Sequence, residues 1–269
     1  MKRSHFLKNI CLSLGAALVL AACGGTQEAT APNGDISAGP WVVGTEPAFP
    51  PFESQSDSGE LEGFDIDLMQ AIGEQAGVDV EFESLPFDGL IPALQAGTIE
   101  AAISGMTITE ERSQTVDFSR PYFRAGLAIA VAADDSETTS LETLEGKTIA
   151  VQIGTTGAKM AGTVKDAKVS TFDSAPLALQ ELSNGNADAV INDAPATLDA
   201  IATGNIDGVK VVGELLTEEF YGIAMPKDSP NLEALNTALA ELIENGTYNT
   251  IYEKWFGASP VSTLPEAAF

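Results

Sequence analysis

Residues 99–112 read Ile-Glu-Ala-Ala-Ile-Ser-Gly-Met-Thr-Ile-Thr-Glu-Glu-Arg. The largely apolar first part, Ile99–Ser104, has the length of a strand, and Gly105 follows it. Thr109 is a residue type that caps helices, so we predict a short helix after it that carries Arg112. A strand followed by a helix is the repeating unit of α/β proteins, and the flanking segments continue that pattern.

Strands and helices alternate on both sides of this stretch. Upstream, an amphipathic helix at 65–76 lies between strands at 41–45 and 78–82, and a second helix is expected to be capped by Asp88. Downstream, the alternation restarts with the strand Thr148–Gln152 and continues beyond it. This order predicts an α/β protein with two lobes, each a mostly parallel sheet flanked by helices.

Two apolar, extended stretches are the predicted crossovers between the lobes. They are Tyr122–Ala132 and Glu218–Ala224, and each has a glycine nearby. A pair of crossovers makes a hinge, and a hinge lets two lobes close around a ligand. The predicted division of the chain is lobe 1 at 40–124 and 222–258, lobe 2 at 125–221, and a C-terminal tail at 259–269.

The charge of the chain is strongly one-sided. Of 269 residues, 39 are acidic and 13 are basic, which gives a formal net charge of −26. A surface this negative repels phosphate backbones and anionic lipid, so we expect no nucleic-acid partner. The hydrophobic fraction of 44% is enough for a folded core, which argues against a disordered chain.

Residues 1–22 have the pattern of an export signal, with a basic start and then an apolar run that is too short for an ordinary membrane span. The end of this segment, Leu20-Ala21-Ala22-Cys23, resembles a bacterial lipobox, in which the cysteine carries lipid. The alternative is a plain signal peptide with a chance cysteine. We predict a lipid-anchored protein on the extracytoplasmic, periplasmic side of the bacterial membrane, with a flexible tether at 23–39.

Removal of the signal segment would restrict the chemistry of the mature chain. His5, the only histidine, and Cys11 would leave with it. If Cys23 is acylated, no free thiol, disulfide or imidazole remains. This excludes a cysteine nucleophile, a Ser-His triad and the usual zinc and haem sites, so we expect no metal and no cofactor.

Two polar features lie in the part predicted as lobe 1. Prolines stiffen the loop Thr45–Phe52, which presents aromatic side chains and Glu46, although its composition also fits an ordinary surface turn. Arg112 has a planar fork of donors that suits a carboxylate, although it could instead pair with Glu110 or Glu111 on the surface.

Two further features lie in the part predicted as lobe 2. Gly154-Thr155-Thr156-Gly157 opens a helix, where free backbone N–H groups can hold an anion, but the lysine of a nucleotide-binding loop is missing. Asn192-Asp193 follows a strand, at the edge of an α/β sheet where ligands bind. Asp193 could equally be a helix cap.

Several motifs resemble one family in order and spacing: Gly63–Leu68, Ile91–Gln95, Gly105–Arg112, Asn245–Tyr248 and Lys254–Phe256. They are similar to those of the polar amino-acid binding proteins of ABC importers, the extracellular solute-binding proteins of family 3. The resemblance runs from about Trp41 to Gly257. It implies the type II periplasmic-binding-protein fold with a two-strand hinge, one free amino acid as ligand, a membrane permease with its ATPase as partners, and a monomer.

The family pattern also implies which residues bind the common part of an amino acid. Arg112 would hold the α-carboxylate, helped by the Thr107 backbone and by Thr155-Thr156. Asp193 would take the α-ammonium group, together with the Gly105 carbonyl and the Thr107 hydroxyl. A zwitterion that leaves water must have both charges paired, and one arginine and one aspartate from different lobes meet that need only when the lobes meet.

The same pattern implies aromatic walls for the ligand side chain. Phe49 and Phe87 would sandwich it, and Phe52 would support them from behind. Ser104 is a further candidate, at a position where the family varies.

Glu46 and Gln152 would meet the far end of the ligand side chain. In the family, glutamine binders tend to have Asp and Lys at these two positions, and this chain is more similar to the arginine and lysine binders. A carboxylate beyond two aromatic rings suits a guanidinium, for which cation–π contacts contribute about 0.5–2 kcal/mol. The resemblance therefore favours arginine, with lysine and histidine, while glutamine stays open because an acid also accepts from a neutral amide.

Two other function classes share the implied fold. A dehydratase-type enzyme would need a positioned acid or base, and the best-placed carboxylates already have binding roles. A sensor is normally joined to a transmembrane helix and a signalling module, so a sensor role would need a separate partner. We therefore expect a transport receptor and not an enzyme.

Overall fold

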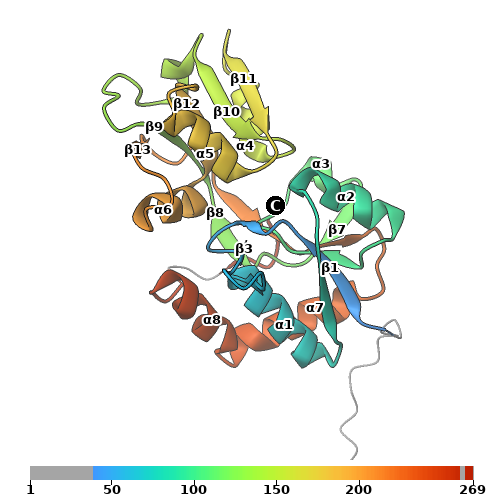
Figure 1. The fold of residues 1–269 in the computed structure, drawn as a ribbon. Coiled ribbons are helices and arrows are strands. Elements are labelled where there is room, and N and C mark those ends of the chain that lie inside the picture. Colours follow the sequence, from blue (N-terminus) through green and yellow to red (C-terminus); the bar gives the residue numbers. More distant parts are fainter. Residues whose placement is uncertain (1–38, 261–263, 269) are drawn as a thin grey trace, which may run out of the picture. The chain divides into compact units, whose positions relative to one another are not determined.

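The computed structural model describes residues 39–260 and 264–268 (Figure 1). The predicted signal peptide, Cys23 and all of the predicted tether except Gly39 lie outside the described residues. The two sheets of the protein belong to the same compact unit, residues 34–269. None of the helices in the described ranges has the length and hydropathy that crossing a lipid bilayer requires.

The described residues form two five-stranded sheets, and the first one carries the segment 99–112. Its strand order is β5 (Val80–Ser84), β1 (Trp41–Thr45), β6 (Ala101–Ala102), β15 (Ala224–Pro226) and β7 (Val116–Phe118). β1 pairs in parallel with β5 and β6, whereas β15 is antiparallel to both of its neighbours. The sheet is therefore mixed, because β15 runs against the other four described strands.

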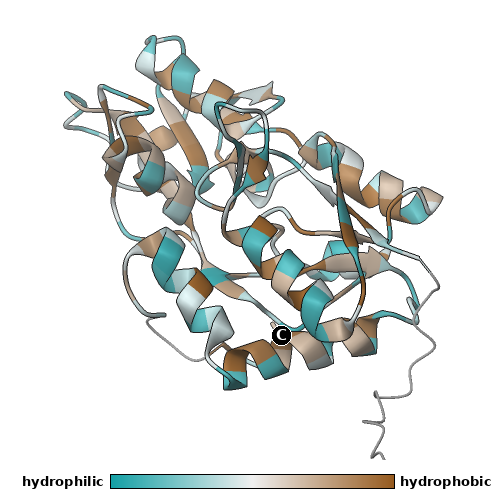
Figure 2. Cartoon of the chain, turned by 60° about the horizontal axis from the view of Figure 1, so that its bottom comes forward, coloured by the Kyte–Doolittle hydropathy of each residue, from teal (hydrophilic) through white to brown (hydrophobic). Residues whose placement is uncertain are grey.

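Alternate residues of β1 face two different helical layers. Trp41 and Val43 pack in one cluster with residues of α1 (Phe64–Ala76), α7 (Leu232–Glu244) and α8 (Thr247–Phe256), which contact one another. Val42 packs on the opposite face with α2 (Phe87–Ala96). This follows from the strand period of two, and Figure 2 shows that the covering helices are hydrophobic on part of their surface only.

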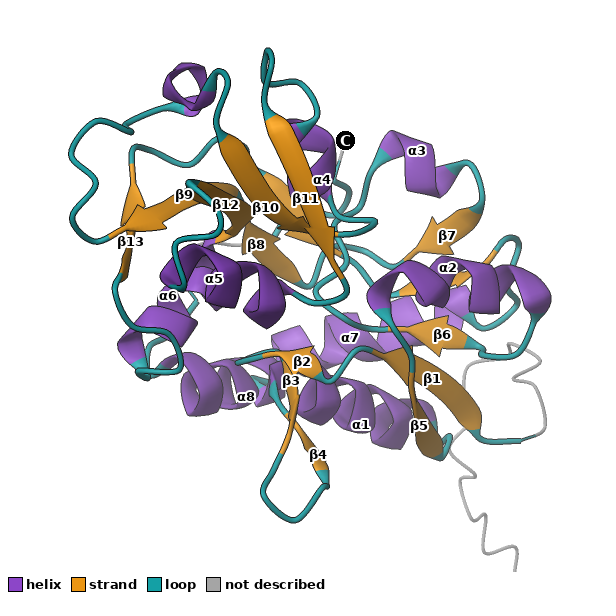
Figure 3. Cartoon of the chain, turned by 45° about the horizontal axis from the view of Figure 1, so that its top comes forward, coloured by secondary structure: helices purple, strands orange, loops and turns teal. Residues whose placement is uncertain are grey.

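The second sheet repeats the plan of the first (Figure 3). Its strand order is β11 (Lys168–Phe172), β10 (Thr148–Gln152), β12 (Ala189–Asp193), β9 (Leu127–Ala132) and β13 (Val209–Val212). β10 is parallel to β11 and β12, and β9 is antiparallel to both of its neighbours. Here too one described strand, β9, runs against the rest, so neither sheet is purely parallel.

Helices cover both faces of the second sheet. Ile149 and Val151 pack with the short helices η1 (Leu141–Leu144) and α4 (Thr156–Ala161). Ala150, between them, packs with α5 (Ala175–Ser183) and α6 (Ala194–Ala202). Each lobe is thus one sheet between two layers of helices, as the type II binding-protein fold requires.

The two predicted crossovers pair with each other as short strands. β8 (Phe123–Ala125) and β14 (Glu219–Tyr221) are antiparallel, because the chain leaves lobe 1 on one and returns on the other. The reversed strands β9 and β15 each follow directly after a crossover. The remaining elements belong to lobe 1: β2 (Ala48–Phe49), β3 (Glu53–Gln55), β4 (Leu61–Glu62) and α3 (Glu110–Ser113).

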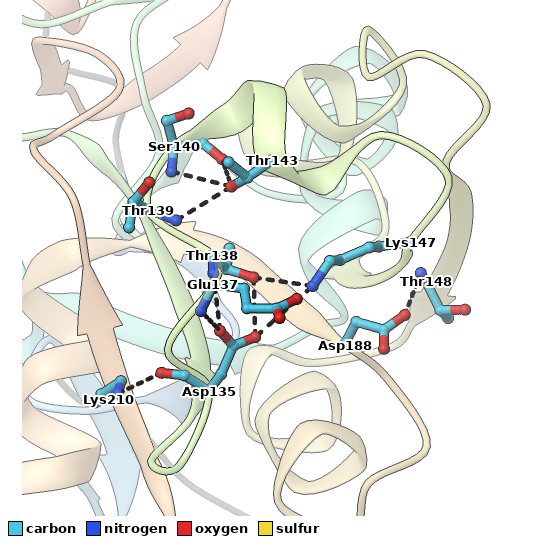
Figure 4. Close-up of polar contacts among 10 residues, drawn as sticks. All are labelled: Asp135, Glu137, Thr138, Thr139, Ser140, Thr143, Lys147, Thr148, Asp188 and Lys210. Carbon is cyan, nitrogen blue, oxygen red and sulfur yellow. Dashed lines mark hydrogen bonds and ion pairs between the residues drawn. The ribbon is translucent and has the colours of Figure 1, made fainter.

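Asp135 organises the loop that follows β9 (Figure 4). Its Oδ1 accepts from the backbone N–H groups of Thr138 and Glu137, both at 2.8 Å, and its Oδ2 accepts from the Thr138 hydroxyl at 2.9 Å. These bonds lower the pKa of Asp135 to about 2. Lys210 on β13 donates to the Asp135 carbonyl at 2.6 Å and so ties the loop to the sheet edge.

Several local boundaries differ from the sequence-based expectation, and the strand expected at 78–82 is found at Val80–Ser84. α2 begins at Phe87 with Pro86 at the cap position, so Asp88 lies in the first turn and does not cap the helix. The strand predicted at 99–104 shortens to Ala101–Ala102, because the chain turns at Gly105, where φ is +51°.

Candidate functional site

A small cavity of about 10 Å³, room for about one water molecule, lies between residues of the two sheets. Pockets that hold a small molecule have volumes of roughly 300–1,000 Å³, so this cavity must widen before a ligand of that size can enter. Lobe 1 and lobe 2 both contribute to its lining, which consists of Glu46, Phe49, Phe87, Ser104, Gly105, Thr107, Arg112, Gln152, Thr155, Thr156 and Asp193. All predicted ligand-binding residues except Phe52 therefore line one cavity.

Phe52 lies behind the cavity wall. Its side chain is fully buried, and its ring stacks on Phe49 with centroids 5.7 Å apart. Phe49 in turn packs against Gly105, where a Cβ atom would lie 2.9 Å from the Phe49 ring. Because Gly105 also has a positive φ, only glycine fits there without strain.

Arg112 is positioned by its own helix and reaches across to lobe 2. Thr109 caps α3 by accepting from the Arg112 N–H at 3.2 Å, as predicted. The Arg112 Nη1 donates to the Thr107 carbonyl at 2.6 Å, and Nη2 donates to the Gly154 carbonyl at 3.0 Å. Its Cζ lies 5.3 Å from the centroid of the Phe87 ring.

The surroundings of Arg112 do not support the surface ion-pair alternative. Glu111 accepts from Lys159 instead, across the two lobes. Burial lowers the pKa of Arg112, and the charges of Asp193, Glu219 and Glu111 oppose that shift. The guanidinium therefore lies in a partly desolvated place with acids around it.

Asp193 is the last residue of β12 and occupies the cap position of α6, but its side chain makes no cap hydrogen bond. Its Oδ1 is buried and is without a hydrogen-bond partner among the described residues. Burial and the charge of Glu219 raise the pKa of Asp193 to about 7, against the opposing effects of Tyr221 and Arg112. The missing cap hydrogen bond argues against helix capping as the role of the Asp193 side chain.

Glu46 and Gln152 are a further polar pair in the lining of the cavity. Gln152 Nε2 donates to Glu46 Oε2 at 2.7 Å, and both residues are buried. Burial raises the pKa of Glu46 to about 7, the bond from Gln152 lowers it, and the charge of Asp88 raises it. The neighbours that shift the pKa of Glu46 are therefore different from those that shift the pKa of Arg112 and Asp193.

The predicted helix start at 154–157 lies at the cavity as well. Thr155 Oγ1 accepts from the Ala158 N–H at 3.1 Å, so Thr155 caps α4, and it donates to the Gln152 carbonyl at 2.8 Å. Gly154 has a φ of +77°, and a Cβ atom there would lie 3.1 Å from Asp88 Cβ. This close approach brings the α4 loop against the first turn of α2.

Two buried acids support the cavity floor, and the sequence reasoning did not assign them a role. Ser104 Oγ donates to Glu53 Oε1 at 2.7 Å and accepts from the Glu46 N–H at 3.0 Å. The Gly105 N–H donates to Asp65 Oδ2 at 2.8 Å. Burial raises the pKa of Asp65 to about 6 and raises that of Glu53 well above its usual range, with the Asp65 charge as a further cause.

Glu219 is a third residue that the sequence reasoning missed. Its Oε2 accepts from the Thr107 hydroxyl at 2.7 Å and from the Thr156 hydroxyl at 3.0 Å. The available signal was the strand period of two, because Glu219 lies on the same face of β14 as the fully buried Tyr221.

The cavity combines one guanidinium, two carboxyl groups and several hydroxyls. In the described part of the chain, no group of three or more His, Cys, Asp or Glu side chains could hold a metal ion. The arrangement suits a small molecule that carries both charges, because each charge then meets a buried partner.

Comparison with known proteins identifies the family of the chain. The model for bacterial extracellular solute-binding proteins, family 3, matches residues 41–258. A probable histidine-binding protein of Neisseria gonorrhoeae is 36% identical over 90% of this chain and 92% of its own length. The L-cystine-binding protein TcyJ of Escherichia coli (strain K12) is 31% identical over 96% of this chain and 98% of its own.

Solved structures show the same fold. An ancestral arginine-binding protein bound to arginine has 49% identity and a TM-score of 0.78, over 82% of this chain and 99% of that one. A structure of an ancestral arginine-binding protein bound to glutamine has 49% identity and a TM-score of 0.76, with the same coverage. The curated relatives are solute-binding proteins rather than enzymes, so the dehydratase alternative has no support from them. The chain belongs to the bacterial extracellular solute-binding proteins of family 3, which bind a polar amino acid for an ABC transporter.

Proposed function

We propose that the cavity binds L-arginine, with lysine and histidine as weaker ligands, and that lobe closure delivers the ligand to the permease of an ABC importer. The observation that carries the proposal is the pair Glu46 and Gln152, which are buried, hydrogen-bonded to each other and part of the lining of an aromatic-walled cavity. A carboxylate placed there pairs with a guanidinium through charge-assisted hydrogen bonds.

Other residues of the cavity lining bind the α-carboxylate and the α-ammonium group. The guanidinium of Arg112 binds the α-carboxylate, together with Thr155-Thr156. Asp193 binds the α-ammonium group, together with the Gly105 carbonyl and the Thr107 hydroxyl. The unpartnered Oδ1 of Asp193 supports this assignment. Phe49 and Phe87 flank the ligand side chain, and Ser104 completes the lining.

Closure accompanies binding. The hinge strands β8 and β14 join lobe 1, at 40–124 and 222–258, to lobe 2, at 125–221, with the tail at 259–269. Because Arg112 and Asp193 come from different lobes, the ligand has its full set of partners only between them, and it stabilises the closed arrangement by its differential affinity. We expect the protein to act as a monomer.

Glutamine is the second candidate ligand. A structure of an ancestral arginine-binding protein holds glutamine. With its pKa near 7, a protonated Glu46 could donate to the carbonyl oxygen of a side-chain amide. The charge on Glu46 therefore decides between the two ligands.

The test is calorimetry of the purified protein with arginine, lysine, histidine, glutamine and cystine, for wild type and Glu46→Gln. We expect the wild type to bind arginine most tightly, and Glu46→Gln to weaken arginine about 10- to 100-fold, as for loss of one charge-assisted bond. The affinity for glutamine should fall by less than about threefold in the same variant. The exposed Glu60→Gln serves as the matched control. Equal losses for arginine and glutamine would contradict the assignment of Glu46.

We also propose that Cys23 carries the lipid anchor at the outer side of the cell membrane. The lipobox-like sequence 20–23 supports this. Wild-type protein expressed with its signal should partition into detergent, and Cys23→Ser should move to the aqueous phase. Equal partitioning of the two would contradict the anchor.

A further inference from the structure

Glu219 lies on the returning hinge strand β14, beside the cavity and outside its lining. Its side chain is buried, and the residue is 8% exposed. The preceding residue, Glu218, instead forms an ion pair with Arg124 on the surface. One of two adjacent acids on the hinge is therefore held inside, next to the site.

The bonds of Glu219 connect both lobes through one oxygen. Thr107 belongs to the segment after β6 in lobe 1, and Thr156 begins α4 in lobe 2. Both hydroxyls donate to Oε2, at 2.7 and 3.0 Å, while Thr217 donates to Oε1 at 3.1 Å. One carboxylate oxygen can accept hydrogen bonds from the hydroxyls of both Thr107 and Thr156 only when the two lobes lie close to each other.

These bonds also orient the hydroxyl groups. Because the Thr107 hydroxyl gives its proton to Glu219, the lone pairs of its oxygen stay available to accept from a ligand. An α-ammonium group has only donors, so this orientation suits the ammonium end of an amino acid.

The charge of Glu219 acts on both main-chain anchors. It favours the charged form of Arg112 and disfavours that of Asp193. Repulsion between Glu219 and Asp193 is relieved when a cation lies between or beside them. The ammonium group of a bound amino acid supplies that cation.

We infer that Glu219 is a positioning residue for the α-amino end of the ligand, which orients the Thr107 hydroxyl and couples the hinge to the closed arrangement through Thr107 and Thr156. The inference rests on the proposed site, but not on arginine being the preferred ligand, because every amino acid has the same α-ammonium group.

The experiment compares Glu219→Gln with the neighbouring control Glu218→Gln. Affinity and dissociation rate are measured for arginine, histidine and glutamine, and the melting temperature is measured without ligand. We expect Glu219→Gln to weaken all ligands that bind by the same factor, about tenfold, mainly through faster dissociation. The melting temperature without ligand should be unchanged or higher, because the repulsion of Asp193 is removed. Glu218→Gln should match the wild type.

The outcomes separate this inference from the proposed function. A wild type that prefers glutamine would refute the arginine proposal, while a common loss in Glu219→Gln would still support the role of Glu219. Wild-type affinity in Glu219→Gln, a loss confined to one ligand, or a loss that accompanies a lower melting temperature would overturn it. If Glu219→Gln does not fold, Thr156→Val removes one of the two shared bonds, and unchanged dissociation in that variant would overturn the inference.

Discussion

Gln152 Nε2 donates a 2.7 Å hydrogen bond to Glu46 Oε2, and the two residues end or follow strands of different sheets. The same bond thus joins the lobes and orients the carboxylate proposed to select the ligand side chain. Selectivity and closure are physically linked at this point, because a change in Glu46 alters both the charge that a side chain meets and a contact between lobes.

Replacement of Arg112 by alanine should abolish detectable binding of every amino acid. The change removes the proposed partner of the α-carboxylate, and a buried ligand charge without a partner costs several kcal/mol. Calorimetry against arginine, histidine and glutamine measures the effect, and Arg124→Ala, an exposed arginine paired with Glu218, is the control. Retained binding of any of these ligands would refute the role of Arg112.

Asp193→Asn should weaken the binding of all amino acids by about 10- to 100-fold, as expected for the loss of one charge-assisted bond. The amide keeps the shape of the side chain, so the melting temperature without ligand should not fall. The pKa of Asp193 is raised to about 7, so at pH 8 its carboxylate is charged and is repelled by Glu219; the amide should remove this repulsion. The exposed Asp207→Asn is the matched control, and near wild-type affinity in Asp193→Asn would leave Asp193 without a ligand role.

The affinity for arginine should fall as the pH falls below 7. Glu46 and Asp193 both have a pKa near 7, and each must lose its proton before it pairs with a cation. Below that pKa, binding must expel the protons, so the dissociation constant rises by up to about tenfold per pH unit for each proton. Glutamine has no cationic side chain, so its binding requires only Asp193, the partner of the α-ammonium group, to be deprotonated. The affinity for glutamine should therefore depend less steeply on pH than the affinity for arginine.

Titration calorimetry at pH 5.5, 6.5, 7.5 and 8.5, in buffers of different ionisation enthalpy, measures both the slope and the protons released. Glu46→Gln should reduce the arginine slope to that of glutamine. If the affinities for arginine and glutamine had the same pH dependence in the wild type, the charge of Glu46 would not contribute to recognition of the ligand side chain.

The acid pair beneath the site should make the protein less stable as the pH rises. Glu53 and Asp65 are fully buried with raised pKa values, so the folded state keeps a proton that the unfolded state releases. The free energy of unfolding therefore begins to decrease above about pH 4, where these acids lose their protons in the unfolded state. The decrease due to Asp65 ends near its folded-state pKa of about 6, and the decrease due to Glu53 continues to higher pH. Each proton contributes a slope of up to about 1.4 kcal/mol per pH unit.

Chemical denaturation without ligand at pH 5 to 8 tests this dependence. Glu53→Gln should make the slope shallower, since its amide needs no proton to stay neutral, while Glu46, Asp65 and Asp193, whose pKa values are also raised, keep part of it. The exposed Glu83→Gln should keep the wild-type slope. A variant Glu53→Gln with the full wild-type slope would show that the pair does not hold the proton.

Much of the fold and the site could be predicted from the sequence, because local patterns carry that information. Residues 41–45 predict the strand β1, and Thr109 predicts the cap of the helix that carries Arg112. The family motifs indicated a set of residues of which only Phe52 does not line the cavity. The choice between arginine and glutamine rests on one carboxylate, and it stays a prediction.

The sequence by itself determined the strands, the helices and the residue types that could meet a charged ligand, since these depend on neighbours within a few positions. Only the tertiary structure decided that β9 and β15 run against their sheets, that Glu219 turns inward while Glu218 faces solvent, and that Glu53 and Asp65 lie under Ser104 and Gly105. The physical reason is that burial and charge coupling depend on segments far apart in the chain. Those segments meet only when the sheets and their crossovers have formed.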